Sequence, residues 1–161
     1  MKLFFIGTYK EKPTTGGHFY HLKMIEAIKH LGHKVSIISF HKLPNFFKCR
    51  PISFFYLLFL FIKKRPSLII QVSDTSLRYI CFSVFIGIMN VPVFQIVHHI
   101  EMNPKTGFLR SRLKSLCLKY NLRKAKTIIV NSMDTRLNVI KLIDVMSEGK
   151  IIVINPGVEK T

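Results

Sequence analysis

Tryptophan is absent from this sequence, and acidic residues are scarce. Only 8 Asp and Glu residues stand against 25 Lys and Arg, which gives a formal net charge of +17. Such an excess predicts long-range attraction to phosphate-bearing partners, whether these are nucleic acids, anionic lipids or sugar nucleotides. Charge alone does not choose among them, and a lysine-rich surface that is merely solvated is the remaining interpretation.

Cysteine is also rare, and its spacing excludes the usual cysteine chemistry. Cys49, Cys81 and Cys117 are far apart and form no CxxC pair, which argues against a zinc site or a redox motif. We expect them to be reduced, with Cys81 and Cys117 buried as small apolar side chains. The apolar start of the chain covers only Leu3 to Ile6, too little for a signal peptide. A reducing cytoplasm is the expected compartment.

Long hydrophobic runs are missing as well. The run Ile52 to Ile62 ends at the basic sequence KKRP, well short of the ~20 residues that cross a bilayer. The longer stretch Tyr79 to Val97 is interrupted by Asn90, Pro92 and Gln95. The sequence therefore favours a chain without a membrane-spanning helix.

What is present is a chain apolar enough to fold. Hydrophobic residues make up 48% of the 161 residues, with 14 Phe among them, which excludes a disordered protein and suits one domain. Apolar strand-like segments alternate with helix-like segments throughout. Near-continuous apolar strands are typical of a parallel sheet covered on both faces, so we predict a doubly wound, mostly parallel, Rossmann-like α/β sheet. Strands are predicted at 2–7, 33–40, 67–72, 91–97, 126–132 and 150–158 (the last with its exit turn), and helices at 16–31, 51–62, 76–89, 108–124 and 135–146.

Two of these helices have apolar residues at helical spacing, which predicts the faces that pack on the sheet. Gly32 is the expected stop of the first helix. The first stripe is Phe19, Leu22, Ile25, Ile28 and Leu31, and the second is Leu109, Leu113, Leu116 and Tyr120.

Basic residues gather beside two of the helices. A cationic helix next to apolar surface can lie on anionic lipid, so these residues are candidates for a membrane or other anionic surface. Solvated or buried helices without that role are the alternative. The candidates are Lys63, Lys64, Arg65, Arg110, Arg112, Lys114, Lys119 and Arg123.

In a doubly wound sheet, ligands bind beyond the carboxyl ends of the strands, so the loops there are the first candidates for function. Gly16 and Gly17 follow the first strand and precede a helix, where free N–H groups and the helix dipole favour an anion. A flexible loop that ends in a glycine cap is the competing interpretation. The dinucleotide pattern G-x-G-x-x-G is absent.

Two histidines follow the strand at 91–97. His98 and His99 are placed to carry a proton or donate a hydrogen bond, and Glu101 can tune either imidazole. A zinc site is the competing idea, but no further ligand follows at metal-binding spacing. Surface histidines without a role are the third interpretation.

Six segments, taken in order, resemble one family. They are TTGGHFYHL, LGHKVSIIS, PSLIIQVS, VPVFQIVHH, RKAKTIIVNSMDT and KIIVINPGVEKT. Together they are similar to the N-terminal, acceptor-side domain of retaining GT-B glycosyltransferases of the glycosyltransferase group 1 family. The resemblance covers almost the whole chain. It implies one Rossmann-like domain over 1–158, with 159–161 beginning a linker to a C-terminal nucleotide-sugar-binding domain that this sequence does not include.

The resemblance also implies roles for single residues. Gly16 and Gly17 match the family's glycine loop, which approaches the donor diphosphate and borders the acceptor pocket. His98 matches the histidine beside the transferred sugar, whereas His99 stands where an acidic or small residue is commoner. Asn131 and Ser132 match an Asn-Ser pair in the family's cleft. His99 and Glu101 are further residues expected to line that cleft. Pro156 and Gly157 match the turn into the second domain.

The implied activity is transfer of a sugar from a nucleotide sugar, such as a UDP- or GDP-sugar, to a lipid-linked or cell-envelope glycan. No metal or further cofactor is expected, and this chain alone is predicted to transfer no sugar. The expected location is cytoplasmic, with peripheral contact at the inner face of the plasma membrane. The alternatives are a basic Rossmann-like module that binds nucleic acid or another phosphorylated ligand without catalysis, and a dinucleotide enzyme. Nucleic acid is the less expected partner because no helix-turn-helix or RRM pattern appears.

Overall fold

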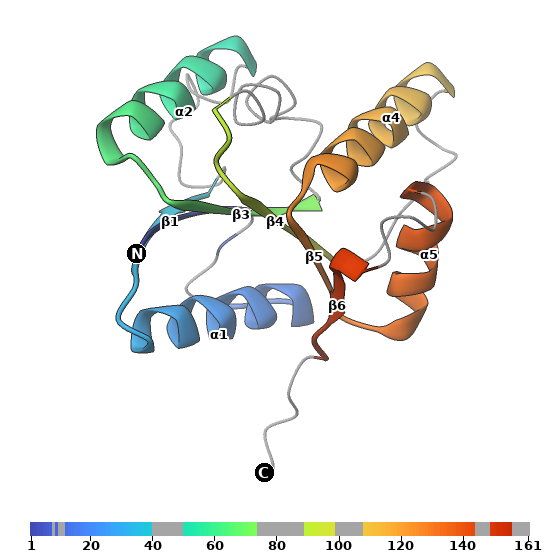
Figure 1. Cartoon of the computed structure of the whole chain (residues 1–161), viewed down its shortest axis with the longest axis horizontal. Helices are drawn as coiled ribbons and strands as arrows, with labels where there is room; N and C mark the ends of the chain where they lie inside the picture. Colours follow the sequence, from blue (N-terminus) through green and yellow to red (C-terminus); the bar gives the residue numbers. More distant parts are fainter. Residues whose placement is uncertain are drawn as a thin grey trace.

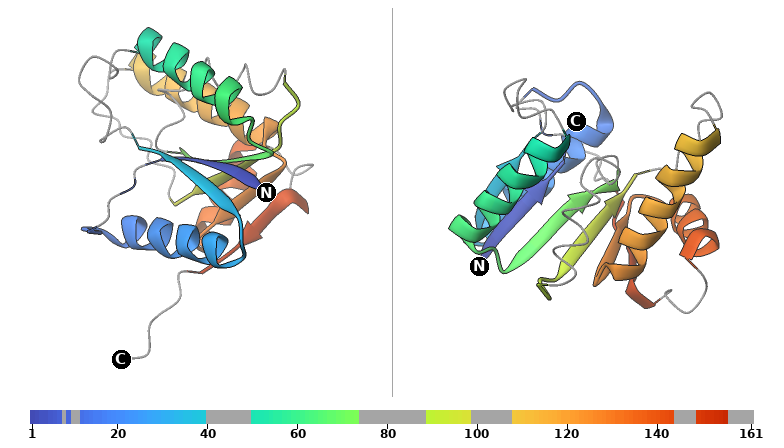
Figure 2. Two further views of the ribbon diagram at one scale, coloured as in Figure 1. Left: turned by 90° about the vertical axis from the view of Figure 1, so that its left-hand side faces the viewer. Right: turned by 90° about the horizontal axis from the view of Figure 1, so that it is seen from above.

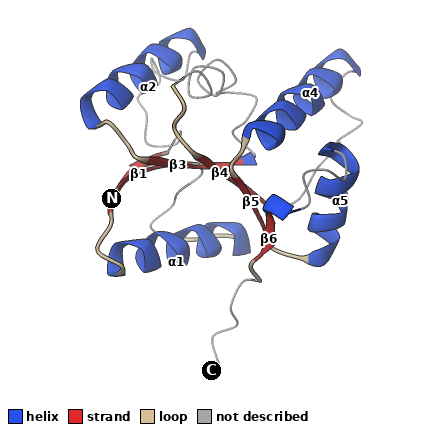
Figure 3. Ribbon diagram, in the orientation of Figure 1, coloured by secondary structure: helices blue, strands red, loops and turns tan. Residues whose placement is uncertain are grey.

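The computed structural model describes residues 1–7, 9, 12–39, 50–73, 89–98, 108–143 and 149–155. Strands and helices alternate along them, except that no helix is described between the third and fourth strands (Figure 3). The strands are β1 (Lys2–Ile6), β2 (Lys34–Ile38), β3 (Leu68–Val72), β4 (Val93–Val97), β5 (Thr127–Val130) and β6 (Ile151–Val153), and the helices are α1 (Gly16–His30), α2 (Arg50–Lys64), α4 (Phe108–Lys124) and α5 (Met133–Ile143).

All the strand pairs are parallel, and they form one six-stranded sheet in the order β2-β1-β3-β4-β5-β6. The chain runs outward from β1 to β2, crosses back to β3 on the other side of β1, and then continues in the opposite direction. This reversal defines a doubly wound sheet, with its switch point between β1 and β3. The carboxyl ends of all the strands lie along one edge.

Helices cover both faces of the sheet. Helix α1 lies on one face and helices α2 and α4 lie on the other, with α5 beside β6 (Figures 1 and 2). Alternate residues of β1 serve the two faces: Phe4 and Ile6 belong to the cluster under α2, and Leu3 and Phe5 to the cluster over α1. Apolar side chains on successive positions are the reason why these strands have no solvated face.

The second half of the sheet has its own core against α4 and α5. Leu118 and Leu122 of α4 meet Val139 of α5 and the apolar side chains of β4 to β6 there. Cys117, also on α4, is buried and is not part of a disulfide within the described residues, as the sequence predicts. Cys49 lies outside the described residues, and so does Cys81.

The predicted fold class and the predicted strands are confirmed, with shorter bounds for most elements. Helix α1 ends where expected: Gly32 has a φ of 79° and its N–H donates to the Lys29 carbonyl at 2.9 Å. Glycine suits this left-handed position because it has no Cβ. The helix predicted at 76–89 falls almost wholly outside the described residues.

The predicted packing face of α4 is wrong at Leu113 and Leu116, although Tyr120 is half-buried. Leu113 and Leu116 are 54% and 58% exposed, and the buried side chains are Cys117, Leu118 and Leu122, together with the polar Asn121. The face of α4 that packs on the sheet is therefore different from the predicted face, and it includes the carboxamide of Asn121. The predicted face of α1 is partly wrong for the same reason: Ile25 is buried, but Phe19 and Leu31 are exposed and Tyr20 and His21 are buried instead.

No helix in the described part of the chain is long and apolar enough to cross a bilayer. The 15-residue helix α2 contains the whole run from Ile52 to Ile62. The buried side of α2, which includes Leu57 and Phe61, packs on the sheet.

Candidate functional site at the carboxyl edge of the sheet

Two histidines from distant parts of the chain meet at the carboxyl edge. His98 follows β4 and His21 lies in the second turn of α1, and their Nε2 atoms are 2.7 Å apart. Their exposed fractions are 5% and 1%, so the pair is shielded from solvent. The Phe5 ring lies edge-on to His21, with ring centroids 5.5 Å apart, and fixes one side of that imidazole.

The short Nε2 to Nε2 distance constrains the protons of this pair. One Nε2 must carry a hydrogen and donate it, and the other must accept it, so the contact holds a single proton between the two rings. A second proton on the same line would place two N–H groups head to head. The pair can therefore hold or pass one proton at this contact, which is the behaviour expected of a group that serves in proton transfer or in neutral hydrogen bonding.

The first turn of α1 lies directly against His98. A Cβ added to Gly17 would stand 3.9 Å from Cδ2 and 4.0 Å from Nε2 of His98, whereas one added to Gly16 would meet open space. Neither glycine has a left-handed φ, so they are not there for backbone strain. They leave the N-terminus of α1 bare of side chains beside a buried imidazole.

The electrostatics of this helix end favour an anion. The first N–H groups of a helix have no intrahelical acceptor, and the helix dipole adds positive potential. Thr15 caps one of them, its hydroxyl accepting from the His18 N–H at 3.3 Å. The first turn contains no acidic side chain. Backbone amides at Gly16 and Gly17 are therefore suited to a phosphate or carboxylate that approaches the edge.

Tyr20 closes the site on the side of the last strand. Its ring packs edge-on against His98, with centroids 5.3 Å apart, and its hydroxyl donates to the Ile154 carbonyl at 3.4 Å. Burial raises the pKa of Tyr20 above the ordinary value of 10.0, so the phenol keeps its hydrogen at neutral pH. Tyr20 thus joins α1, the end of β4 and the segment after β6 into one rigid unit.

A hydroxyl network joins the end of β4 to the start of α5. The Thr135 hydroxyl donates to the His98 carbonyl at 2.9 Å and also lies 3.1 Å from the Asn131 side-chain oxygen. Ser132 caps α5: its hydroxyl oxygen accepts the Thr135 N–H at 3.1 Å and lies 2.9 Å from the Thr135 hydroxyl. The network fixes the backbone at His98, and hence the point from which the imidazole leaves β4.

The structure thus brings together Gly17 and His98, and links Asn131 and Ser132 to them through Thr135. Three contributors were missed from the sequence: Tyr20, His21 and Thr135. His21 had a usable signal, since His21, Ile25 and Ile28 also stand at helical spacing. Four predicted site residues lie outside the described residues: His99, Glu101, Pro156 and Gly157.

The described histidines, cysteines and carboxylates include no group of three or more that could hold a metal ion. Among the predicted surface residues, Lys63, Lys64, Arg65, Arg112 and Arg123 are exposed and Lys119 is half-buried, while the side chains of Arg110 and Lys114 lie outside the described part.

The fold and this edge define the class of protein: a doubly wound, Rossmann-like α/β domain with a polar candidate site where β1, β4 and β5 end. Comparison with protein-family models and with curated proteins found no match for the chain.

Proposed function

We propose that this chain is the acceptor-side domain of a retaining GT-B glycosyltransferase that transfers a sugar from a nucleotide sugar to a lipid-linked or cell-envelope glycan. The donor is a UDP- or GDP-sugar, and the second wall of the cleft comes from a C-terminal Rossmann-like domain. The proposal rests on the six ordered segments that resemble the family and on one structural observation. That observation is the contact between Gly17, in the bare first turn of α1, and the buried His98 at the carboxyl edge.

The contact supports this function because the two parts have complementary chemistry. The amides at the start of α1 suit the negative charge that develops on a departing diphosphate. The imidazole beside them suits a hydroxyl of the transferred sugar or of the acceptor. In this proposal the acceptor hydroxyl oxygen attacks the anomeric carbon on the face that the diphosphate leaves, so the configuration is retained. The bond from that carbon to the diphosphate breaks, the hydroxyl proton passes to the departing diphosphate, and the site holds the reacting groups in place.

His21 acts as a positioning residue in the same proposal. Its Nε2 holds the Nε2 of His98 at 2.7 Å, so the His98 ring has one orientation before substrate arrives. Thr135 does the same for the His98 backbone. A ring fixed in advance loses less entropy when substrate binds, which raises the rate at a given affinity.

Exposed apolar and basic side chains on the α2 and α4 face support peripheral contact with an anionic membrane. Phe55, Phe59 and Ile62 are 65%, 58% and 61% exposed and stand at helical spacing on one side of α2. The basic run of residues 63–65 follows at once, and the Lys63 ammonium lies 5.7 Å from the centroid of the Phe59 ring. Apolar rings that enter the acyl boundary beside lysines that meet lipid phosphates are typical of interfacial helices.

Sugar transfer is tested with the natural protein that contains this sequence. The protein is incubated with radiolabelled UDP- and GDP-sugars and with a membrane lipid extract as acceptor. We expect label in the lipid-soluble product only when protein, donor and acceptor are all present, and we expect the product to keep the donor's anomeric configuration by NMR. Failure of the whole donor panel, or inversion at the anomeric carbon, contradicts the proposal.

Membrane contact is tested by flotation with vesicles. We expect the protein to float with vesicles that contain phosphatidylglycerol and not with pure phosphatidylcholine, and to be released by salt. Replacing both Phe55 and Phe59 by serine removes two exposed rings and should lower the bound fraction by about tenfold or more. Leu31→Ser is the matched control, because Leu31 is equally apolar and 73% exposed but lies at the end of α1, on the opposite face. Strong DNA binding with no vesicle binding contradicts membrane contact.

A further inference from the structure

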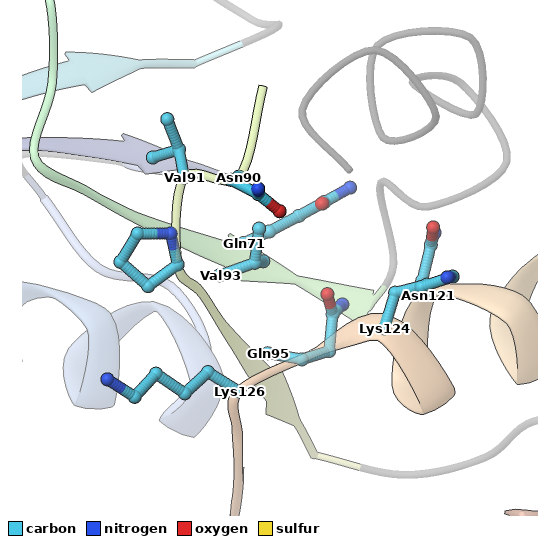
Figure 4. Close-up of a pocket in the computed structure, with 9 residues that line it drawn as sticks. Gln71, Asn90, Val91, Val93, Gln95, Asn121, Lys124 and Lys126 are labelled. Carbon is cyan, nitrogen blue, oxygen red and sulfur yellow. The ribbon is translucent and has the colours of Figure 1, made fainter. Parts of the chain in front are cut away.

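A polar cavity lies on the opposite face of the sheet from the histidine pair. Its volume is about 400 Å³, within the range of small-molecule sites. It lies between the residues that lead into β4 and the last turns of α4, so it faces the amino edge of the sheet rather than the carboxyl edge (Figure 4). The segment Val91–Val93 forms an apolar wall, and Lys124 and Lys126 stand at its margin.

Three carboxamides from the sheet and α4 line this cavity, and Asn90, before β4, adds a fourth. Gln71 of β3 and Gln95 of β4 are register partners on neighbouring parallel strands, so their side chains rise on the same side of the sheet. Asn121 of α4 faces them from the helix layer (Figure 4). The clustering comes from the topology, since these residues are distant in the sequence.

Two of these amides have no hydrogen-bond partner among the described residues. Gln95 is fully buried and Asn121 is 5% exposed. Within the described residues, neither the nitrogen nor the oxygen of either carboxamide has a hydrogen-bond partner. Buried polar groups are almost always hydrogen-bonded, and a leucine of similar size would pack here without that cost. Two unsatisfied amides that border the same cavity therefore point to a polar occupant.

The lining indicates the chemistry of that occupant. Each carboxamide both donates and accepts, which complements hydroxyl groups, because these also do both. Lys124 and Lys126 favour an anionic group near the margin, and the chain's charge of +17 adds to that attraction. The carbonyls at the end of α4 carry partial negative charge, which disfavours an anion at this margin. That effect is reduced because the Arg123 carbonyl already accepts a hydrogen bond from the Lys150 ammonium at 2.8 Å. Val91–Val93 offers an apolar surface for the C–H face of a ring.

We infer that this cavity binds a small phosphorylated polyhydroxyl compound of the sugar-phosphate class, with its hydroxyls on Gln95 and Asn121 and its phosphate toward Lys124 and Lys126. The site is separate from the histidine pair, which lies with Phe5 and Tyr20 on the α1 face. It does not rest on the proposed function, because it uses other residues at the other edge of the sheet.

Calorimetric titration of the natural protein tests the site with four probes: glucose 6-phosphate, glucose, inorganic phosphate and AMP. Glucose 6-phosphate should bind at least about tenfold more tightly than glucose or phosphate, since only it engages both the amides and the lysines. The dissociation constant should rise about tenfold or more in Gln95→Leu and, separately, in Asn121→Leu. Thermal melts of the free variants should be unchanged or higher, which separates loss of the site from loss of the fold.

Two further variants complete the design. Lys124→Ala combined with Lys126→Ala should weaken glucose 6-phosphate binding and reduce its salt dependence, whereas Lys29→Ala, an exposed lysine on α1, should change neither. His98→Ala should leave this binding unchanged, because it alters the other site. The inference is overturned if glucose 6-phosphate does not bind, if binding survives both leucine variants, or if AMP binds more tightly than glucose 6-phosphate.

Discussion

Replacing His98 by alanine is expected to lower the rate of sugar transfer by at least about tenfold, the lower end of what a positioned acid, base or hydrogen-bond donor contributes. The His98 side chain is 5% exposed and lies against the first turn of α1. His98 directly follows β4, at the edge where ligands of such sheets bind. Alanine removes the imidazole and leaves a space in which the reacting groups are no longer held. Steady-state turnover with the donor and acceptor identified by the transfer assay measures the loss.

The same substitution should also cost stability, for a reason visible only in the structure. His21 is buried and loses the hydrogen bond that His98 Nε2 makes with it, which costs about 1–3 kcal/mol of unfolding free energy. Turnover must therefore be compared well below the melting temperature of the variant. Circular dichroism melts, recorded beside the kinetics, keep the two effects apart.

A double-mutant cycle separates the roles of the two histidines. If His21 acts only by positioning His98, His21→Leu should lower turnover by less than His98→Ala, and the double variant should be no slower than His98→Ala alone. His30→Ala is the control, since that residue is exposed in the last turn of α1. Unchanged turnover in His98→Ala removes His98 from the site.

Much of this fold is predictable from the sequence because its parallel strands are apolar on both sides. The LIIQV segment of β3 and the TIIV segment of β5 leave no solvated face, and each is followed by a helix-length segment. That combination permits few arrangements other than a covered parallel sheet. The position of His98 after β4 follows from the same pattern, and so does the placement of Asn131 and Ser132 after β5.

The rest depends on how each helix is rotated about its axis, which the sequence specifies weakly. On α4, Leu113 and Leu116 offered an apolar stripe as good as that of Leu118 and Leu122, and the buried Asn121 made the true stripe look polar. On α1, Phe19 and Leu31 fitted the predicted apolar stripe although they are exposed, so the sequence pattern did not identify the buried face that contains His21. Burial of a polar side chain is the property that periodicity misses, because the surroundings of that side chain, such as the His98 imidazole beside His21, come from another part of the chain.

Replacing Phe5 by alanine is expected to lower the free energy of unfolding by about 3–5 kcal/mol, the cost of a large cavity in a rigid core. Phe5 is fully buried in β1, a central strand, where it pairs with Ile37 of β2 and Ile70 of β3. A domain of this size has about 5–15 kcal/mol in total, so the loss is a large part of its stability. We expect the thermal midpoint to fall by about 10 °C, as measured by calorimetry.

Phe55→Ala is the matched control for this prediction, since it removes the same atoms from a side chain that is 65% exposed on α2. Its effect should stay within about 0.5 kcal/mol. Equal shifts in the two variants would contradict the packing described for β1. Phe5 also contacts the His21 ring, so the smaller change Phe5→Leu should disturb the histidine pair while most of the core survives. A shift of the His21 and His98 ring signals by NMR in Phe5→Leu, absent in Phe55→Ala, would show that the core of the sheet sets the geometry of the candidate site.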